Sequence, residues 1–167
     1  SCSDQVESNA RSHFIKSKDF IYTNIDLHNV YGSPCDFNPK TAQVIPSLIY
    51  KSLNNDLLEV WGDGNQGRAF IEIRDVINAI DLAIKTPMDE TFMIGPNKCS
   101  TIKEVVNEIL KNDVQAKSVN YDATKPTGDI GRFYSGSKSK ELLGWEPKIS
   151  LSDGIRDLVE FIKINDS

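Results

Sequence analysis

Hydrophobic positions along the chain change their period several times, and each change predicts a new helix or strand. Between Val44 and Leu53 the apolar residues recur at helical spacing, with Pro46 in the first turn, which favours a helix. Shorter alternating runs predict strands at Leu57–Trp61, Thr91–Ile94 and residues 118–121. One more strand is expected at residues 20–27, running into a loop at residues 29–32 (NVYG).

Two further helices are predicted from capping residues followed by apolar stripes. Asp75 is expected to cap one helix, whose apolar face would comprise Val76, Ile77, Ile80, Leu82, Ala83 and Ile84. Thr101, with Glu104 at capping-box spacing, is expected to cap the next, whose core face would comprise Ile102, Val105, Val106, Ile109 and Leu110. Both helices follow short strands, as in an α/β protein.

The ends of the chain also carry helix signals. Residues 4–18 predict a helix that ends in a basic turn. A short helix is expected to stop at Gly144, and Ser152 or Asp153 is expected to cap a last helix that runs towards Asn165.

The strands and helices alternate, but the strands are few and short. The segments at residues 33–41 and 124–136 are rich in proline and glycine and predict loops. A complete doubly wound sheet opens with a glycine-rich strand–helix turn. The one GxGxxG spacing in this sequence, at Gly62–Gly67, leads instead to an arginine and a predicted strand. We therefore expect α/β architecture in one domain, residues 1–167, that corresponds to the C-terminal part of a larger fold.

Composition and charge exclude several classes of function. The 167 residues carry a net charge of −5 and a pI near 5.0, which argues against a nucleic-acid surface. No apolar run is long enough to span a membrane and no signal peptide is visible, so a cytoplasmic location is expected. Three scattered cysteines and two histidines predict neither a disulfide framework nor a metal site.

The segment at residues 61–76 (WGDGNQGRAFIEIRDV) carries the strongest chemical signal. Its glycine-rich turn leads to a lone arginine, Arg68, followed by an apolar strand and a helix. Glycines let the backbone close around a ligand, and a guanidinium matches the paired oxygens of a phosphate. The pattern therefore predicts an anion site.

Five motifs in this order resemble one family: NVYG, GDGNQGR, DVINAI, KPTGDIGR and ELLGWEPKISLSDGI. Together they resemble the C-terminal half of the extended short-chain dehydrogenase/reductase family, the NAD(P)-dependent nucleotide-sugar epimerases and dehydratases. The nearest types are GDP-mannose 3,5-epimerase and GDP-fucose synthase, and the resemblance spans roughly residues 7–162. In that family the dinucleotide cradle and a catalytic Tyr-x-x-x-Lys pair precede this region. The Tyr-x-x-x-Lys spacing occurs here only at Tyr121–Lys125 and Tyr134–Lys138, which both follow NVYG and so do not match the position of the family pair.

The resemblance implies roles for particular residues. Arg68 and Arg132 match arginines that contact the nucleotide diphosphate. Asn29 matches an asparagine at the junction of cofactor and substrate. Tyr31 shapes the same loop, and both residues are expected to contact the cofactor. Val44 begins a helix whose start touches the sugar nucleotide in the family. Its side chain is expected to lie in the core, with the backbone in contact with the ligand.

Other positions are less decisive. Lys125 and Asp129 lie in a loop that runs along the nucleotide in relatives, but the same sequence makes a solvated turn without any ligand. Asp26 stands where the family usually has an arginine. Trp61 and Trp145 could stack on a base, but burial is the commoner position for tryptophan.

Three functions remain open at this point. The chain is expected to form the substrate-binding half of a nucleotide-sugar epimerase, dehydratase or reductase, with NAD or NADP bound only in the complete enzyme and no activity of its own. Alternatively it binds sugar nucleotides without catalysis, or it is a protein-interaction module. A homodimer or a separate dinucleotide-binding partner is expected in either of the first two cases, with no nucleic acid or membrane partner.

Overall fold

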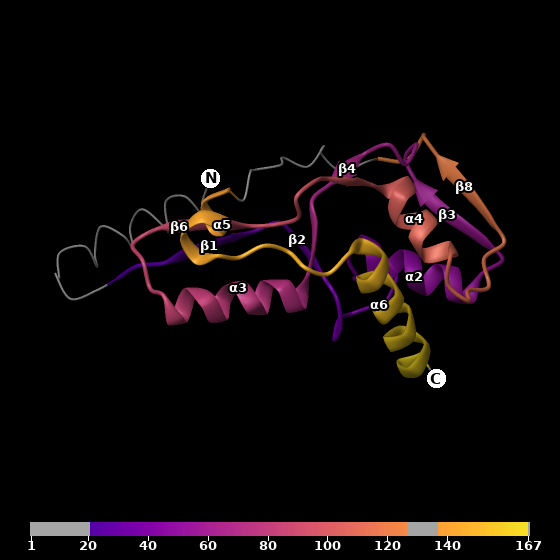
Figure 1. Cartoon of the computed structure of the whole chain (residues 1–167). Coiled ribbons are helices and arrows are strands. Elements are labelled where there is room, and N and C mark those ends of the chain that lie inside the picture. The colour runs from indigo at the N-terminus through magenta and orange to yellow at the C-terminus, as the bar shows by residue number, and fades with distance from the viewer. Residues whose placement is uncertain (1–20, 127–136, 167) are drawn as a thin grey trace.

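The computed structural model describes residues 21–126 and 137–166 (Figure 1). The predicted helix at residues 4–18 and most of the loop at residues 124–136 lie outside this part. The helices, labelled as in Figure 1, are α2 (Val44–Asn54), α3 (Ile73–Lys85), α4 (Ile102–Leu110), α5 (Ser137–Leu143) and α6 (Leu151–Asn165). The strands are β1 (Asn24–Leu27), β2 (Asn29–Tyr31), β3 (Leu57–Trp61), β4 (Gly67–Arg68), β5 (Phe70–Glu72), β6 (Thr91–Ile94), β7 (Ser100–Thr101) and β8 (Ser118–Asp122).

The strands pair two by two, and most of the pairs are parallel. Within the described residues β1 pairs with β6, β2 with β5 and β3 with β8, all parallel, whereas the two-residue strands β4 and β7 are antiparallel. Parallel strands separated by helices confirm the predicted α/β class.

The hydrophobic side chains form two clusters at opposite ends of an elongated molecule (Figure 1). The larger cluster lies among α2, α4, α6, β3 and β8 and includes Ile49, Leu58, Val105 and Ile162, all fully buried. The smaller cluster lies among α3, α5 and β6 and contains Phe92 and Trp145. The strands β2 and β5 run between the two ends, because Tyr31 and Phe70 belong to the first cluster and Ile71 to the second.

Most predicted elements are confirmed, but several boundaries are wrong. Residues 29–31 form a strand rather than a loop, because Asn29 to Tyr31 pair with β5. The helix α3 begins two residues before Asp75, and its N-cap is Glu72, whose carboxylate accepts the backbone N–H of Arg74 at 2.7 Å. The capping box of Thr101 and Glu104 is present as predicted.

Asp75 has a different task from the predicted cap. Its carboxylate is buried and accepts the backbone N–H groups of Lys148 and Ile149 at 2.9–3.1 Å. The indole N–H of the buried Trp145 donates to the backbone carbonyl of Asp75 at 2.9 Å. Asp75 therefore attaches the segment before α6 to α3. The N-cap of α6 is Ser150, not Ser152 or Asp153.

The predicted apolar face of α3 is only partly correct. Val76, Ala79 and Ala83 are buried, but Ile77, Ile80 and Ile84 are 57%, 39% and 72% exposed. The helix is apolar on two sides, so its pattern cannot show which side meets the core. The outward isoleucines, at helical spacing, form an apolar surface of the described structure.

None of the helices in the described residues combines the length and apolarity that crossing a membrane requires.

Removing the carboxylate of Asp75 should destabilise the fold. In Asp75→Ala two backbone N–H groups lose their acceptor, and we expect the free energy of unfolding to fall by about 1–3 kcal/mol. Urea denaturation followed by circular dichroism measures it. The control is Asp81→Ala, an exposed α3 residue paired only with Lys85, which should change stability by less than about 0.5 kcal/mol. Equal losses in the two variants would contradict the role assigned to Asp75.

Candidate functional site

The position of Arg68 is set by the glycine-rich loop between β3 and β4. The first-turn N–H groups of Ile102 and Lys103 in α4 donate to the carbonyls of Gln66 and Gly64 at 3.2 and 2.9 Å. These N–H groups have no partner within a helix, so the loop caps α4 with its own backbone. Arg68 then pairs with Ser100 in the short ladder of β4 and β7.

Two glycines of this loop, Gly62 and Gly64, have a positive φ that favours glycine. Gly64 has a φ of +76°, and a Cβ placed there would lie 2.5 Å from the Tyr121 ring and 2.8 Å from Lys103. The loop is also held by its own side chains. Asp63 accepts the backbone N–H of Asn65 at 2.9 Å, and this bond is the main cause that lowers the pKa of the exposed Asp63 carboxyl.

A pocket of about 380 Å³ lies between this loop, α2 and β3. Its size falls within the range of small-molecule sites. The lining residues are Pro39, Ala42, Val44, Ser47, Leu48, Lys51, Glu59, Val60, Trp61, Gln66, Arg68, Ile102 and Pro126.

Local structure explains why these side chains meet. Val44, Ser47, Leu48 and Lys51 are spaced by three and four residues, so they occupy one side of α2. In β3 the exposed positions alternate with buried ones, and Trp61 is 55% exposed. Gln66 fixes the end of β3 because its side-chain amide donates to the backbone carbonyl of Trp61 at 3.1 Å.

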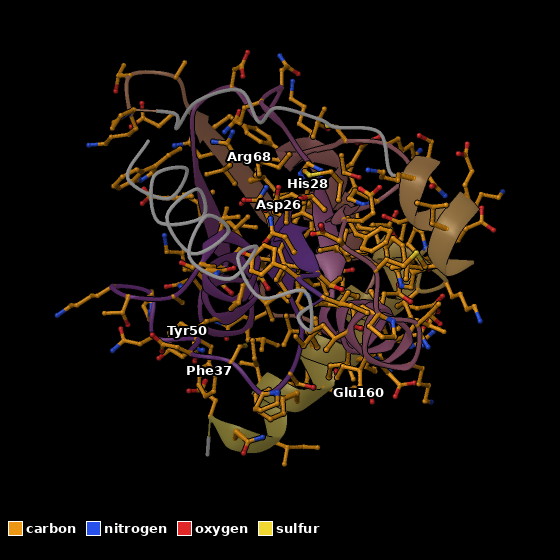
Figure 2. All side chains as sticks on the ribbon, turned by 90° about the vertical axis from the view of Figure 1, so that its left-hand side faces the viewer. Asp26, His28, Phe37, Tyr50, Arg68 and Glu160 are labelled. Carbon is orange, nitrogen blue, oxygen red and sulfur yellow. The ribbon has the colours of Figure 1, made fainter. Side chains whose placement is uncertain are left out.

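Arg68 differs from the other arginines that the structure describes. Arg74 forms ion pairs with Glu72 and Asp157, and Arg156 forms ion pairs with Asp153 and Asp157. Arg68 makes no ion pair or hydrogen bond through its guanidinium with any residue in the described ranges. Figure 2 shows Arg68 on the upper side of the molecule, away from Glu160 on α6. Its five donors are therefore available to an anion.

The pocket has a different charge balance from the whole chain. Its ionisable lining groups are Lys51, Arg68 and Glu59, two cations and one carboxylate, which gives a net charge of +1 in a protein of net charge −5. A local excess of positive charge favours the binding of an anionic ligand in this pocket.

The structure brings several predicted site residues together. Val44 lines the pocket with Arg68 and is 41% exposed, so its side chain contacts the pocket rather than the core. Asn29 lies next to Arg68 along the fold, because its backbone N–H and its side-chain amide both donate to the carbonyl of Ala69, at 2.9 and 3.3 Å. Lys125 is exposed and precedes the lining residue Pro126 but does not itself line the pocket.

Tyr31 lies inside the fold. It is buried, packs edge to face with Phe70 at 6.3 Å, and faces Gly154, where a Cβ would come within 2.4 Å of the hydroxyl. Burial raises the pKa of this hydroxyl, and the carboxylate of Glu72 raises it further. Tyr31 therefore fixes the NVYG segment against α6, and its assignment to the cofactor stays a prediction.

The remaining expectations divide into three groups. Arg132 and Asp129 lie outside the described residues. Asp26 is exposed and accepts a hydrogen bond from Asn24 at 3.1 Å. Burial is confirmed for Trp145 but wrong for Trp61, which is at the pocket because it occupies an outward position of β3.

Lys51, Glu59 and Gln66 also line the pocket and were not predicted as site residues. The alternation of β3 could have pointed to Glu59, but the side of α2 that faces β3 is decided only by packing. The histidines, cysteines and carboxylates of the described ranges form no group able to hold a metal ion.

Comparison with known proteins identifies the family of this chain. The model of the family described as "NAD dependent epimerase/dehydratase family" matches residues 8–95. The chain belongs to the NAD dependent epimerase/dehydratase family. The match covers both the NVYG segment and the loop that carries Arg68, and so agrees with the predicted resemblance.

Relatives in this family include enzymes for different nucleotides. A "Putative UDP-glucose 4-epimerase" of Methanocaldococcus jannaschii is 35% identical over 146 residues, which cover 86% of this chain and 46% of that protein. GDP-L-fucose synthase 1 of Arabidopsis thaliana is 33% identical over 134 residues, 76% of this chain and 41% of that protein. The chain thus spans less than half the length of these relatives.

A solved structure of this family confirms the Rossmann-like class of the fold. UDP-glucose 4-epimerase of Thermotoga maritima, crystallised with UDP-glucose, matches with a TM-score of 0.81 and 27% identity over 93% of this chain and 50% of that one. The crystallised enzyme is about twice as long as the part that matches.

The two tryptophans give a direct test of the site geometry. In the parent chain, iodide should quench the fluorescence of the exposed Trp61 but not that of the buried Trp145. In Trp61→Phe only Trp145 remains, so iodide should quench little of the fluorescence and the emission maximum should lie at a shorter wavelength. Steady-state fluorescence with stepwise iodide measures this. Full quenching of Trp145 in folded Trp61→Phe would contradict the buried position of that side chain.

Proposed function

We propose that this chain supplies the substrate-binding half of an NAD(P)-dependent nucleotide-sugar epimerase or dehydratase, and that its pocket holds the nucleoside diphosphate. The observation that carries the proposal is Arg68, whose guanidinium has no partner in the described structure and lines a pocket with an exposed tryptophan. An arginine fork binds two phosphate oxygens at once, so it fixes the orientation of the ligand as well as its position.

The pocket residues suggest a division of tasks. Arg68 would hold the diphosphate, and Arg132 would add a second cation. Val44 would contact the nucleoside from the first turn of α2. Lys125 and Asp129 would lie along the nucleotide, and Asn29 would stand between substrate and cofactor. Binding energy from the diphosphate would then orient a sugar for reaction.

The residues described here do not form a dinucleotide cradle. The GxGxxG spacing at Gly62–Gly67 leads into the strands β4 and β5 rather than into a helix, as a dinucleotide fingerprint would. The side chain of Tyr31 is buried, and the amide of Asn29 is already bonded to Ala69. NAD or NADP, which accepts and returns a hydride, would therefore be held by a dinucleotide-binding half. The chain alone would bind substrate without turning it over.

The outer surface of α3 is where such a half would pack. Ile77, Ile80 and Ile84 are exposed, and β1 pairs on one edge with β6 within the described strands. Apolar side chains and an unpaired strand edge both favour association with another sheet. In a cytoplasmic enzyme, that surface would be covered by the dinucleotide half or by a second subunit.

A non-catalytic nucleotide-binding module is the second candidate. The observation that favours it is that every described residue that lines the pocket comes from one stretch of chain, residues 39–126. Reconstitution with a dinucleotide half separates the two functions, because only the enzyme half would restore turnover.

Truncating Arg68 should weaken nucleotide binding. We expect Arg68→Ala to raise the dissociation constant of its sugar nucleotide roughly 10- to 100-fold, because a charged hydrogen-bonding pair is lost. Calorimetric titration of the whole chain with GDP-mannose, UDP-glucose and dTDP-glucose measures it. The matched control is Arg156→Ala, an exposed α6 arginine outside the pocket, which should bind like the parent chain.

Two results would contradict the proposal. One is equal binding by Arg68→Ala and the parent chain. The other is the absence of saturable binding by any of the three sugar nucleotides.

A further inference from the structure

Two side chains of opposite charge lie together in the pocket without forming an ion pair. Lys51 comes from α2 and Glu59 from β3, and both line the same pocket as Arg68. Neither side chain makes a hydrogen bond or an ion pair with another residue in the described ranges, although other lysines of the structure pair with nearby carboxylates. Both groups therefore keep their full capacity to bind polar atoms of a ligand.

Lys51 and Glu59 mark one end of the pocket. They also line the adjoining hollow formed by Asn54, Asn55, Asp56, Leu57 and Gln115, whereas Arg68, Val44 and Trp61 do not. Lys51 is seven residues after Val44 in α2, about 10 Å along the helix axis. Glu59 is two residues before Trp61 in β3, about 7 Å along the strand. The pocket thus runs from Arg68 towards this pair.

These spacings match the parts of a nucleoside diphosphate. With the diphosphate on Arg68, the base would reach the surface of Trp61, which is exposed and can stack on a planar ring. The far edge of the base would then face Lys51 and Glu59. A cation donates hydrogen bonds and a carboxylate only accepts them, so this end of the pocket recognises an acceptor beside donors.

Guanine has this arrangement on its Watson–Crick edge: the O6 acceptor, followed by the N1–H and N2–H donors. Lys51 can donate to O6 while the two oxygens of Glu59 accept the two parallel N–H groups. Uracil and thymine have acceptors on both sides of a single N–H, so one oxygen of Glu59 would face the O2 oxygen. Adenine would place its N1 acceptor against the carboxylate.

We propose that Lys51 and Glu59 recognise the base and make the pocket selective for guanosine diphosphates over uridine diphosphates. This inference rests on the proposed function of the same pocket, and it adds the base that the site accepts. The family does not settle the choice, since relatives of this chain include both a GDP-L-fucose synthase and a UDP-glucose 4-epimerase by name. A site that offers hydrogen bonds to specific polar atoms rejects a ligand that leaves them unpaired.

The test compares bare nucleotides, so that no sugar contributes. The whole chain is titrated calorimetrically with GDP, UDP and IDP, the last of which equals GDP without its N2 amino group. We expect GDP to bind at least tenfold more tightly than UDP or IDP. The variant Glu59→Gln keeps the size of the side chain but loses its charge and one acceptor. Its affinity for GDP should be at least tenfold lower than that of the parent chain, and it should no longer bind GDP more tightly than IDP.

A matched control is Glu160→Gln, an exposed α6 residue that Figure 2 places away from Arg68. It should keep the affinities of the parent chain. Glu59 is exposed and has no partner in the described residues, so Glu59→Gln should fold normally, and circular dichroism checks this. Lys51→Met should lower the affinities for GDP and UDP by a similar factor, because O6 of guanine and O4 of uracil are both hydrogen-bond acceptors.

The outcomes separate this inference from the function on which it rests. Equal affinities for GDP and UDP, both reduced in Arg68→Ala, would overturn the base assignment and leave the diphosphate site standing. If Glu59→Gln lowers the affinities for GDP and UDP by the same factor, the base assignment is also overturned. If none of the three nucleotides binds, the proposed function fails and the inference fails with it.

Discussion

The backbone hydrogen bonds between the glycine-rich loop and the first turn of α4 determine the site. They satisfy N–H groups of Ile102 and Lys103 that a helix cannot satisfy itself, and they fix where the loop ends. Arg68 follows directly in a two-residue strand. Because the bonds use carbonyls of the loop, the guanidinium of Arg68 remains available to the pocket, and so does the Oε1 atom of Gln66, whose amide nitrogen is bonded to Trp61.

Charge is distributed so that this arginine stays free. The chain is acidic overall, and the other two described arginines, Arg74 and Arg156, are paired with carboxylates. Arg68 lies in a pocket where the single carboxylate, Glu59, is two strand positions beyond Trp61. Arg68 is half-buried and has no ion-pair partner in the described residues, so an anionic ligand can form charge-assisted hydrogen bonds with it without displacing a carboxylate.

The two hydrophobic clusters show how the site is attached to the rest of the fold. Asp75 and Trp145 tie the segment before α6 to α3, and α6 packs on Tyr31 of the NVYG segment. The strands β2 and β5 therefore connect the pocket end of the molecule with the end where α3 presents its isoleucines. Binding of a partner on α3 and of a nucleotide near Arg68 would act on opposite ends of one connected structure.

The sequence by itself determined the elements whose causes are local. The capping box at Thr101, the stop at Gly144, the helix from Val44 and the family motif around Arg68 depend on neighbours a few residues away. Tertiary structure decided what depends on distant partners. Asp75 accepts N–H groups more than seventy residues away, so its role as an anchor rather than a cap is not visible in the sequence. The exposed positions of the α3 isoleucines were likewise not predictable, because a helix that is apolar on two sides does not show which side faces the core.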